Sequence, residues 1–448
     1  MKSTRGMHGM RLNLRKYLLV LGLLVAVVIS LVFSYLIWIN PARSQANSSA
    51  TSSTPNSALP DSIRKKVGDI YLPTNVVFND DAKQYRLTSD TLDLTNYTKK
   101  QLVKWQYEDI KRLPTKSAST YQRYLHTKNA LVLNYPVAVT ARTVAETFNF
   151  KVSKYKSALI SRIIIPLTKM DRIYLLDDKQ EAVYMVGLKK ATKQKLIALA
   201  KDKDNLRSEV TFEKIGDKYT LFYQDGIKVA QYSYLLNKES TGLFVNRLLG
   251  TNNTSAITAK EQDATTTYSD GAAMRLTIQK KTGAVTFNDY NSSNSRRNYS
   301  YENYLTAGLT NLNNIGVALD DVRYDCYNSR RHLLTYRNYI NGYPVIAAES
   351  AGAYSILLTN SGKKRLDFSL YTLQIPVPSA GGAITLPNTR WVISQLLSRG
   401  YDQAKIGDIK VGYSWNQNQT SNQVVDLKPT YFVKYDNQWS DYQSLLNS

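Results

Sequence analysis

The chain has 448 residues and a formal net charge of +23, from 58 basic and 35 acidic side chains. In a cytoplasmic protein this charge would favour a nucleic-acid partner. Its single cysteine, Cys326, excludes an intrachain disulfide, whereas animal secreted proteins of this size usually carry several. The composition therefore agrees best with a bacterial protein that works at the cell surface.

The first expected element is a transmembrane helix over residues 17–39, which read YLLVLGLLVAVVISLVFSYLIWI without a charged side chain. About 20 apolar residues are needed to cross the hydrocarbon core of a bilayer, so this segment is long enough. Tyr17 stands at one end, and Tyr35 and Trp38 stand near the other. Amphipathic rings prefer the membrane interface, so these aromatic positions support the prediction.

The flanking charges predict the orientation of this helix. Residues 1–16 contain no acid and five cations, namely Lys2, Arg5, Arg11, Arg15 and Lys16. Beyond the helix, Arg43 is the only cation before Asp61. The positive-inside rule then makes residues 1–16 a cytoplasmic tail of a single-pass protein of the cell membrane, with the bulk extracytoplasmic. The alternative is a cleaved signal peptide, but its apolar core is usually only about 7–15 residues long.

This topology changes the expected partners of the basic chain. Nucleic acid is excluded, and membrane lipid or an anionic cell-wall polymer becomes the plausible polyanion. The basic residues are nevertheless spread along the sequence, and the pairs Lys189-Lys190 and Arg330-Arg331 are only short clusters. A dispersed charge that only aids solubility explains the composition equally well.

Residues 40–66 are rich in Ser, Thr, Asn, Ala and Pro and predict a flexible linker. The remainder is too long for one ordinary core. We expect an N-terminal extracytoplasmic domain over residues 67–160, a middle α+β domain over 161–305 and a C-terminal α+β domain over 306–448.

The fold class expected is α+β, with β-hairpins as the dominant signal. Four predicted hairpins turn at Asp225-Gly226, Lys281-Thr282-Gly283, Asn341-Gly342 and Asn360-Ser361-Gly362. Asp-Gly and Asn-Gly are strong turn signals because type I′ turns need positive φ at both central residues. Four helices are predicted, over residues 98–112, 140–150, 189–202 and 389–399. The last is amphipathic and is followed by Gly400.

The sequence offers no candidate catalytic or metal-binding group. His126, His332 and Cys326 stand alone, without metal-ligand spacing or a flanking signature. Neither a glycine-rich phosphate loop nor a G-x-S-x-G motif occurs. We therefore expect neither an enzyme, nor a cofactor, nor a metal.

Penicillin-binding proteins carry S-x-x-K, S-D-N and K-T-G motifs. Here Ser153 and Lys156 match the first motif, Ser269-Asp270-Gly271 lacks the asparagine of the second, and Lys281-Thr282-Gly283 matches the third. The last two are too close together for that fold, and the third is explained by a hairpin turn. A wall-active enzyme is thus the least favoured interpretation.

The predicted transmembrane helix contains a stripe of small residues: Gly22, Ala26, Ser30 and Ser34. Spacing by four places them on one slanting face of a helix, where a second helix can approach closely. We predict that this stripe packs against the membrane helix of a partner.

The chain resembles the YycH family of membrane-anchored regulators of low-GC Gram-positive bacteria. The resemblance extends from SLVFSYLIWINP in the anchor through IYLPTNVVF, TTYSDG, NYINGYPVI and KIGDIKVGYSW to LKPTYFVKYDNQW near the C-terminus. The sister family, YycI, has similar C-terminal features in a shorter chain. One departure is Tyr431, where tryptophan is expected.

This resemblance implies a role in signal transduction. YycH-like proteins associate with a YycI-like protein and with the sensor histidine kinase WalK, also called YycG, whose two-component system controls cell-wall metabolism. The implied function is modulation of that kinase through membrane helices and outer domains, without catalytic residues. The implied fold is several α+β domains, the later two related in topology.

Overall fold

The computed structural model describes Leu23 and residues 64–448, except 116, 169–170, 251–256, 292–298, 318, 348–350, 380 and 448. The chain divides into two compact units, residues 1–56 and 57–448, and the described strands belong to the second. The predicted transmembrane helix lies outside the described residues, apart from Leu23. Among the helices that are described, none is long and apolar enough to span a membrane.

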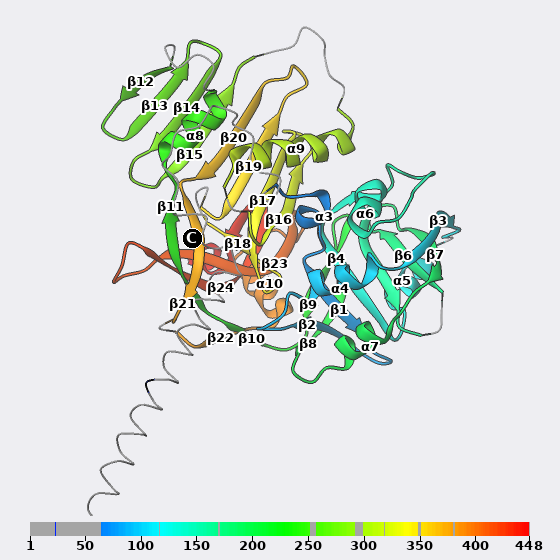
Figure 1. The fold of residues 1–448 in the computed structure, drawn as a ribbon. Coiled ribbons are helices and arrows are strands. Elements are labelled where there is room, and N and C mark those ends of the chain that lie inside the picture. Colours follow the sequence, from blue (N-terminus) through cyan, green and yellow to red (C-terminus); the bar gives the residue numbers. More distant parts are fainter. Residues whose placement is uncertain are drawn as a thin grey trace, which may run out of the picture. The chain divides into compact units, whose positions relative to one another are not determined.

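Nine strands from the first half of the chain form one antiparallel sheet, in the order β3-β7-β6-β5-β4-β1-β2-β8-β9 (Figure 1). The strands are β1 (Asn75–Asn79), β2 (Gln84–Thr88), β3 (Gln106–Leu113), β4 (Ala130–Thr140), β5 (Leu159–Pro166), β6 (Arg172–Asp177), β7 (Ala182–Lys190), β8 (Leu206–Ile215) and β9 (Lys218–Tyr223). Successive side chains of a strand face opposite sides. Thus Ile163 and Ile165 of β5 join one hydrophobic core, and Ile164 joins another.

Helices cover the Ile163 face of this sheet. Apolar residues of α3 (Val67–Ile70), α4 (Leu94–Leu102), α6 (Ala141–Phe148) and α7 (Gln194–Lys201) belong to the same core as Ile163. Helix α5 (Ala118–Leu125) packs on the opposite face, because Tyr121 and Leu125 share the core of Ile164. Polar side chains begin two of the helices: Asp93 caps α4, and Thr140 caps α6.

The second half of the chain forms a 14-stranded sheet. Its main path is β12-β13-β14-β15-β20-β19-β17-β18-β23-β24-β11-β21, with β16 paired to β17 and β25 to β24. The strands are β11 (Tyr232–Lys238), β12 (Ile257–Glu261), β13 (Thr265–Asp270), β14 (Met274–Gln279), β15 (Ala284–Asp289), β16 (Val322–Asn328), β17 (Leu333–Ile340), β18 (Tyr343–Ile346), β19 (Ala353–Leu358), β20 (Lys364–Ser369), β21 (Tyr371–Val377), β23 (Ile406–Gln417), β24 (Val424–Tyr435) and β25 (Gln438–Asp441).

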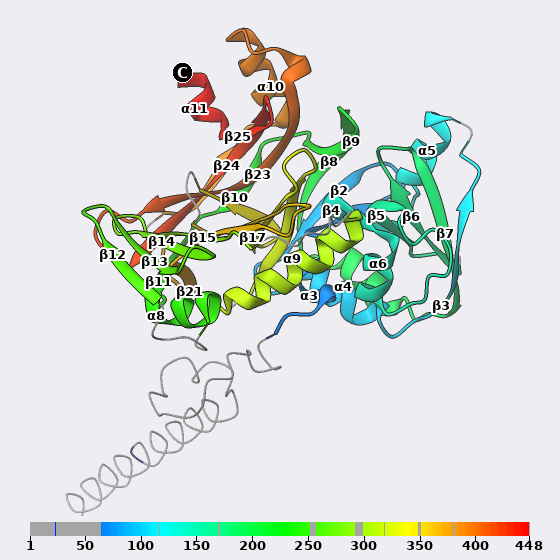
Figure 2. The same ribbon diagram turned by 90° about the horizontal axis from the view of Figure 1, so that it is seen from above.

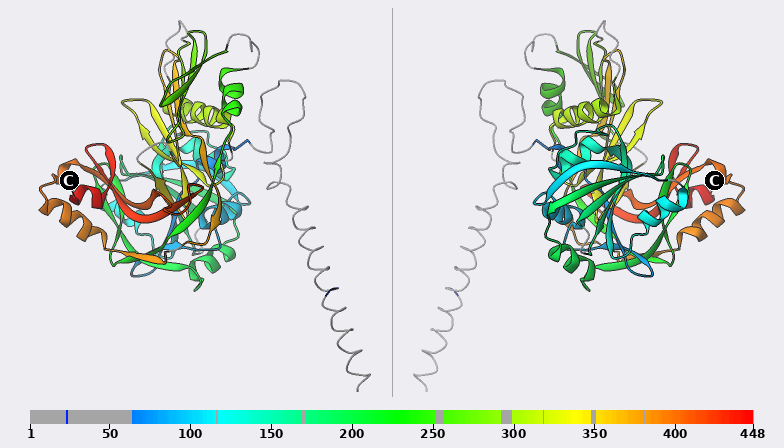
Figure 3. Two further views of the ribbon diagram at one scale, coloured as in Figure 1. Left: turned by 90° about the vertical axis from the view of Figure 1, so that its left-hand side faces the viewer. Right: turned by 90° about the vertical axis from the view of Figure 1, so that its right-hand side faces the viewer.

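The other elements of this half surround that sheet. Strands β10 (Ile227–Ala230) and β22 (Ala383–Leu386) pair with each other. The helices are α8 (Thr241–Phe244), a π-helical turn (Val245–Leu249), α9 (Tyr301–Ile315), α10 (Thr389–Ser398), a 3₁₀ turn (Gln403–Lys405) and α11 (Tyr442–Asn447). Figure 2 shows α9 between the strands β12–β15 and the helices α4 and α6. Near the C-terminus, α10 and α11 lie side by side (Figure 3).

Both hydrophobic cores contain residues from both sheets. One core joins Leu131 and Ile163 of the first sheet to Leu334 and Phe368 of the second. The other joins Val77, Val132 and Ile164 to Val345, Val411 and Val433. The two halves of residues 64–448 are therefore not separate domains, because each half contributes residues to both hydrophobic cores.

The α+β fold class is confirmed, and so are most of the predicted hairpins. Ile340 pairs with Tyr343 across Asn341-Gly342, whose φ angles are +50° and +75° as a type I′ turn requires. The hairpins at Lys281-Thr282-Gly283 and Asn360-Ser361-Gly362 also form, between β14 and β15 and between β19 and β20.

The hairpin predicted at Asp225-Gly226 is wrong. Both flanking runs are strands, but β9 pairs with β8 and β10 pairs with β22. The segment thus carries the chain from the nine-stranded sheet to the two-stranded β10–β22 sheet. An Asp-Gly turn suits both a hairpin and a connection between two sheets. Only the distant strands with which β9 and β10 pair determine which of the two forms.

Three of the predicted helices form with adjusted limits, as α6, α7 and α10. The helix predicted over residues 98–112 is wrong in its second half. Helix α4 ends at Leu102, and Gln106–Leu113 becomes edge strand β3, which pairs with β7. Tertiary pairing overrides the helical propensity of this polar segment.

The expected domain limits at 160 and 305 do not coincide with the division between the sheets. Residue 160 lies in β5, which pairs with β4 across that limit, and residue 305 lies inside α9. The chain passes from the first sheet to the second after β9. Of the predicted linker, residues 64–66 are described, and Lys65 is bonded to Asn313 and Asp320.

Candidate functional site

Several buried charged side chains, among them Arg86, Arg162 and Asp408, lie where the two sheets meet. A cavity of about 100 Å³ opens there between β1, β2, β4 and β9 of the first sheet and β17, β18 and β23 of the second. We call its polar lining the seam: Arg86, Asn134, Tyr135, Arg162, Lys218, Tyr339, Asp408 and Lys410. A neighbouring cavity of about 230 Å³ shares Arg86 and Tyr339 with it.

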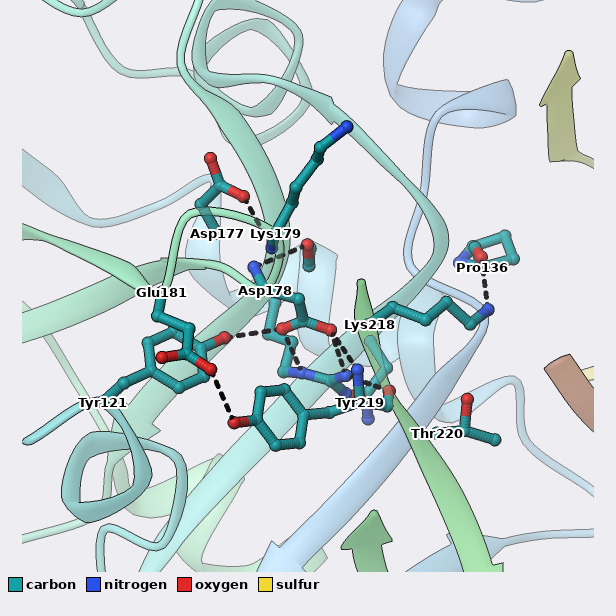
Figure 4. A network of polar contacts seen from close by, with 12 residues as sticks. Tyr121, Pro136, Asp177, Asp178, Lys179, Glu181, Lys218, Tyr219 and Thr220 are labelled. Carbon is teal, nitrogen blue, oxygen red and sulfur yellow. Dashed lines mark hydrogen bonds and ion pairs between the residues drawn. The ribbon is translucent and has the colours of Figure 1, made fainter. Parts of the chain in front are cut away.

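An ion pair inside the first sheet supports the seam (Figure 4). Arg162 donates from Nε and Nη2 to the two oxygens of Asp178, at 3.0 and 2.6 Å, and both side chains are buried. Asp178 also accepts from the hydroxyl of Tyr121 at 2.6 Å and from the backbone N–H of Tyr219 at 2.9 Å. Burial and the charge of Asp178 raise the pKa of Tyr121, which keeps this hydroxyl protonated as a donor.

A second pair joins the sheets directly. Lys218 of β9 lies 2.5 Å from a carboxylate oxygen of Asp408 in β23. The other oxygen of Asp408 accepts from the hydroxyl of Thr220 at 3.0 Å and from the N–H of Ile409 at 2.9 Å. Lys218 also reaches the carbonyl of Pro136 at 3.4 Å (Figure 4). The carboxylate of Asp408 is thus fully satisfied by its own neighbours.

The third acidic centre is Asp325 of β16, whose side chain is completely buried. It accepts from Lys410 at 2.7 Å, from Arg337 at 3.0 Å and from the hydroxyl of Tyr339 at 2.6 Å. Burial alone would raise the pKa of this carboxyl, but Lys410 and Arg337 hold it well below the ordinary value of 3.8. Asp325 therefore remains ionised in the folded protein.

The depressed pKa of Asp325 predicts acid sensitivity. Because the unfolded chain binds a proton at a higher pH than the folded chain, Asp325 stabilises the fold above pH 3.8 and loses this effect as the pH falls further. Asp325→Asn should lower the free energy of unfolding by about 2 kcal/mol at pH 7, and the deficit should shrink towards pH 2. Urea unfolding at several pH values measures this. Asp217→Asn, which changes an exposed carboxylate, serves as control. If the loss of unfolding free energy in Asp325→Asn does not vary with pH, as in the control, the pKa of Asp325 is not depressed in the folded protein.

Arg86 of β2 is the one seam cation that has no carboxylate partner among the described residues. It donates from Nη2 to the carbonyl of Gly342 at 2.9 Å and from Nη1 to the hydroxyl of Tyr223. Its guanidinium lies 3.7 Å from the ring centre of Tyr343. Arg86 therefore joins the first sheet to the β17–β18 hairpin of the second.

Tyrosine hydroxyls form hydrogen bonds between the two halves in the core that contains Ile163. The hydroxyl of Tyr71, next to α3, lies 2.8 Å from that of Tyr336 in β17 and 2.5 Å from the carbonyl of Leu305. Tyr301 of α9 donates to the carbonyl of Ala138 in β4 at 2.6 Å. Part of the chain's abundant tyrosine is thus used to satisfy buried polar groups between the halves.

The sequence-predicted packing stripe, Gly22, Ala26, Ser30 and Ser34, lies outside the described residues. The three singled-out reactive side chains are described and stay apart. His126 follows α5 and contacts Gln122 at 3.1 Å, and His332 stacks on Tyr304 with ring centres 4.9 Å apart. Burial raises the pKa of the Cys326 thiol, which disfavours the nucleophilic thiolate.

The residues that resemble penicillin-binding motifs are not brought together. Ser153 is hydrogen-bonded to Asp109 of β3, at the edge of the first sheet. Ser269 and Asp270 belong to β13, and Lys281 lies in the β14–β15 turn, both in the second sheet. No cluster of three or more His, Cys, Asp or Glu residues suited to a metal occurs in the described part of the chain.

The seam was missed by sequence reasoning, although two signals were available. Arg162 interrupts the apolar run LISRIIIP, and a lone cation inside a buried strand must find a partner. Arg86 in QYRLT gives a similar but weaker signal. The partner carboxylates, at positions 178, 325 and 408, could not be assigned without the fold.

Two family models together match nearly the whole chain. The YycH protein N-terminal domain matches residues 15–208, and the YycH protein C-terminal domain matches residues 219–447. The chain belongs to the YycH family. The first match ends inside β8 and the second begins inside β9, near the passage from one sheet to the other, and residues of both matched regions line the seam.

One solved structure has the same fold as this chain. The crystal structure of YycH from Bacillus subtilis superposes with a TM-score of 0.67 at 17% identity, covering 85% of this chain and 97% of that one. This likeness shows that the YycH fold is shared. An uncharacterized protein from Eubacterium rectale is also similar, with a TM-score of 0.30, 10% identity and coverage of 51% and 81%. No curated protein matches the chain.

The YycH family is a regulatory family and not a known enzyme family. Family membership thus suggests a regulatory role in the YycG/WalK system. The seam agrees with a structural use of charge, since three of its four cations are neutralised by carboxylates within hydrogen-bonding distance.

Proposed function

We propose that this YycH-family chain is a non-catalytic accessory regulator of the sensor histidine kinase WalK/YycG. It would act in a complex with a YycI-like protein, anchored in the cell membrane by residues 17–39 with the N-terminus cytoplasmic. The observation that carries the proposal is the match of both YycH domains along the chain.

The shared cores of residues 64–448 support a role in which binding at one family domain affects the other. Both hydrophobic cores contain residues of both sheets. Arg86 and Lys218 of the first sheet also bind Gly342 and Asp408 of the second. A partner that binds one family domain therefore acts on a body that includes the other. A regulator shifts a kinase between conformations only if it binds one of them better.

We further propose that recognition of the kinase complex involves the small-residue stripe. Gly22→Leu together with Ala26→Leu should keep the helix inserted, because leucine is more apolar than either residue. The larger side chains should block close approach of a neighbouring helix. Interhelical contacts are worth about 1 kcal/mol each, so association should weaken about tenfold or more.

Co-purification of WalK/YycG and of a YycI-like protein from crosslinked membranes measures this effect, together with transcription of wall-hydrolase genes. Val20→Leu together with Val28→Leu, on the opposite face, controls for hydrophobicity. If the stripe and control variants recover equal amounts of the kinase, the stripe is not the recognition site, and recognition must involve the outer domains. Failure of wild-type protein to recover any histidine kinase would contradict the proposed function itself.

A further inference from the structure

The cations of the first half of the chain gather over one layer of helices. This layer comprises residues 64–70, 93–104, 141–156 and 189–204, which hold the helices α3, α4, α6 and α7 and the segments next to them. It carries sixteen basic and five acidic side chains, a formal net charge of +11, which is nearly half of the +23 of the whole chain. Residues 387–447, with α10 and α11, carry six basic and five acidic side chains. Charge that looks dispersed in the sequence is therefore concentrated in the fold.

The four segments of this layer are exposed on the same side of the molecule. Each of them buries apolar residues in the core of Ile163, among them Ile70, Leu102, Phe148 and Leu196. A side chain that stays exposed on such a segment lies on the outer surface of the layer. Helices α3, α4 and α6 lie side by side at this surface (Figure 2), and α7 contacts α4. The exposed cations of the layer therefore share one face.

Most of these cations have no ionic partner in the described part of the chain. Three of the sixteen form ion pairs, with Asp69, Glu302 and Asp320, and Lys193 is half-buried. The other twelve are exposed and form no ion pair with a described residue, and we call them the basic face. They lie in residues 64–66, 100–104, 151–156 and 189–203. Because like charges repel one another, an anionic partner stabilises such a surface.

The place where the described chain begins indicates which anion is at hand. Arg64 and Lys66 belong to the basic face, and the backbone of Lys65 is bonded on both sides to Asn313. The chain thus enters its folded unit at this face. Residues 40–63, which follow the predicted anchor, span at most about 85 Å even when fully extended. An anchored chain therefore keeps the basic face within reach of the bilayer.

We propose that the basic face docks onto the anionic headgroups of the lipid bilayer that holds the anchor. Near an anionic membrane each Lys or Arg strengthens the contact about fivefold. The attraction decays over a Debye length of about 8–10 Å at physiological salt, so only a face that touches the headgroups benefits from it. The inference rests on the membrane anchor of the proposed function, but it does not depend on the kinase partner.

The test uses the full-length protein inserted into lipid nanodiscs of two compositions. One is phosphatidylcholine alone, and the other is phosphatidylcholine and phosphatidylglycerol in equal parts. Lysines are acetylated with an N-hydroxysuccinimide ester, and mass spectrometry gives the rate at each lysine. Lys100, Lys154 and Lys195 should react about tenfold more slowly on the anionic discs, because headgroups cover them. Salt at about 1 M, where the Debye length is about 3 Å, should abolish this difference.

A triple variant, Lys100→Gln/Lys154→Gln/Lys195→Gln, removes one cation from each of three segments of the basic face. Three charges strengthen the contact about a hundredfold, so the lysines that remain on the face should lose their protection. Lys104 of this variant should then react at the same rate on both discs. The substituted positions are exposed, so the unfolding midpoint should stay unchanged. Protection of Lys104 that persists in the triple variant would overturn the inference.

The matched control is Lys363→Gln/Lys405→Gln/Lys428→Gln, which removes the same charge from exposed positions in the second half of the chain. In wild type these three lysines should react equally on both discs. The control variant should keep the slow acetylation of Lys100 on the anionic discs. Equal loss of protection in the control and the triple variant would show that only the net charge matters, which would contradict a specific face.

The remaining outcomes separate this inference from the proposed function. If the chain does not insert into discs of either composition, the anchor is wrong, and both proposals fail together. Insertion with equal acetylation on both discs overturns the inference alone. In a third arm, a glycerol phosphate polymer is added to the phosphatidylcholine discs. If the polymer protects the basic face and phosphatidylglycerol does not, the face binds a wall polymer, and the proposed lipid contact is overturned.

Discussion

Arg162→Leu is expected to lower the free energy of unfolding by about 3–5 kcal/mol. The substitution leaves the carboxylate of Asp178 buried, with 3% of its side chain exposed, and removes both of its charge-assisted bonds to arginine. The hydroxyl of Tyr121 and the N–H of Tyr219 remain as donors but do not neutralise the charge. Urea unfolding of the full-length protein, followed by tryptophan fluorescence, measures the change.

The double variant Arg162→Leu/Asp178→Leu tests the reason for this loss. Removing both charges should be less destabilising than removing Arg162 alone, because no uncompensated charge is left behind. Lys179→Ala is the control for an exposed ion pair: Lys179 lies 3.6 Å from Asp217, and both are largely solvent-exposed. Its effect should stay within about 0.5 kcal/mol. Equal losses in Lys179→Ala and Arg162→Leu would show that the Arg162 pair is not buried.

Gly342→Ala is expected to destabilise the protein by about 2–5 kcal/mol, through two separate causes. Gly342 has a φ of +75°, which alanine adopts at a cost of about 1–2 kcal/mol. A Cβ at this position would also lie 2.4 Å from the backbone carbonyl oxygen of Thr74, in the other half of the chain. A backbone atom cannot rotate away, so the β17–β18 hairpin has to move off the first sheet.

Gly216→Ala isolates the first cause, the positive φ. Gly216 also lies in a hairpin turn, between β8 and β9, with a φ of +58°, but a Cβ there meets no atom within 4 Å. Its loss should stay at about 1–2 kcal/mol, the conformational cost alone. Thermal unfolding of both variants compares them. If Gly342→Ala is no worse than Gly216→Ala, the close approach of hairpin and first sheet is not a tight contact.

The sequence was most informative where structure is decided locally. Asn341-Gly342 determines its own turn, because the type I′ conformation needs residues that tolerate positive φ. The amphipathic pattern of Thr389–Ser398 likewise determines α10. The run Gln106–Leu113 became a strand only because β7 lies beside it, and a pairing partner 70 or more residues away leaves no mark on the local sequence.

The same limit explains why the candidate site escaped prediction. Asp178 lies in the turn after β6, where an acidic residue is unremarkable, yet its side chain is bonded to the buried Arg162. Arg86 has no acidic partner to be searched for, and the hydroxyl of Tyr135 is indistinguishable by sequence from those of the other 32 tyrosines. These residues are distinguished by buried polar atoms that lack a hydrogen-bond partner, and this property is visible only in the folded structure.

The shared cores also bear on biogenesis. Ile164 packs in one core with Val411 and Val433, which are synthesised some 250 residues later. At about 5–20 residues per second, this face of the first sheet waits on the order of 10–50 s for its cover. An apolar sheet face left open for so long favours aggregation, so a nascent chain of this design needs a holdase until β24 has emerged.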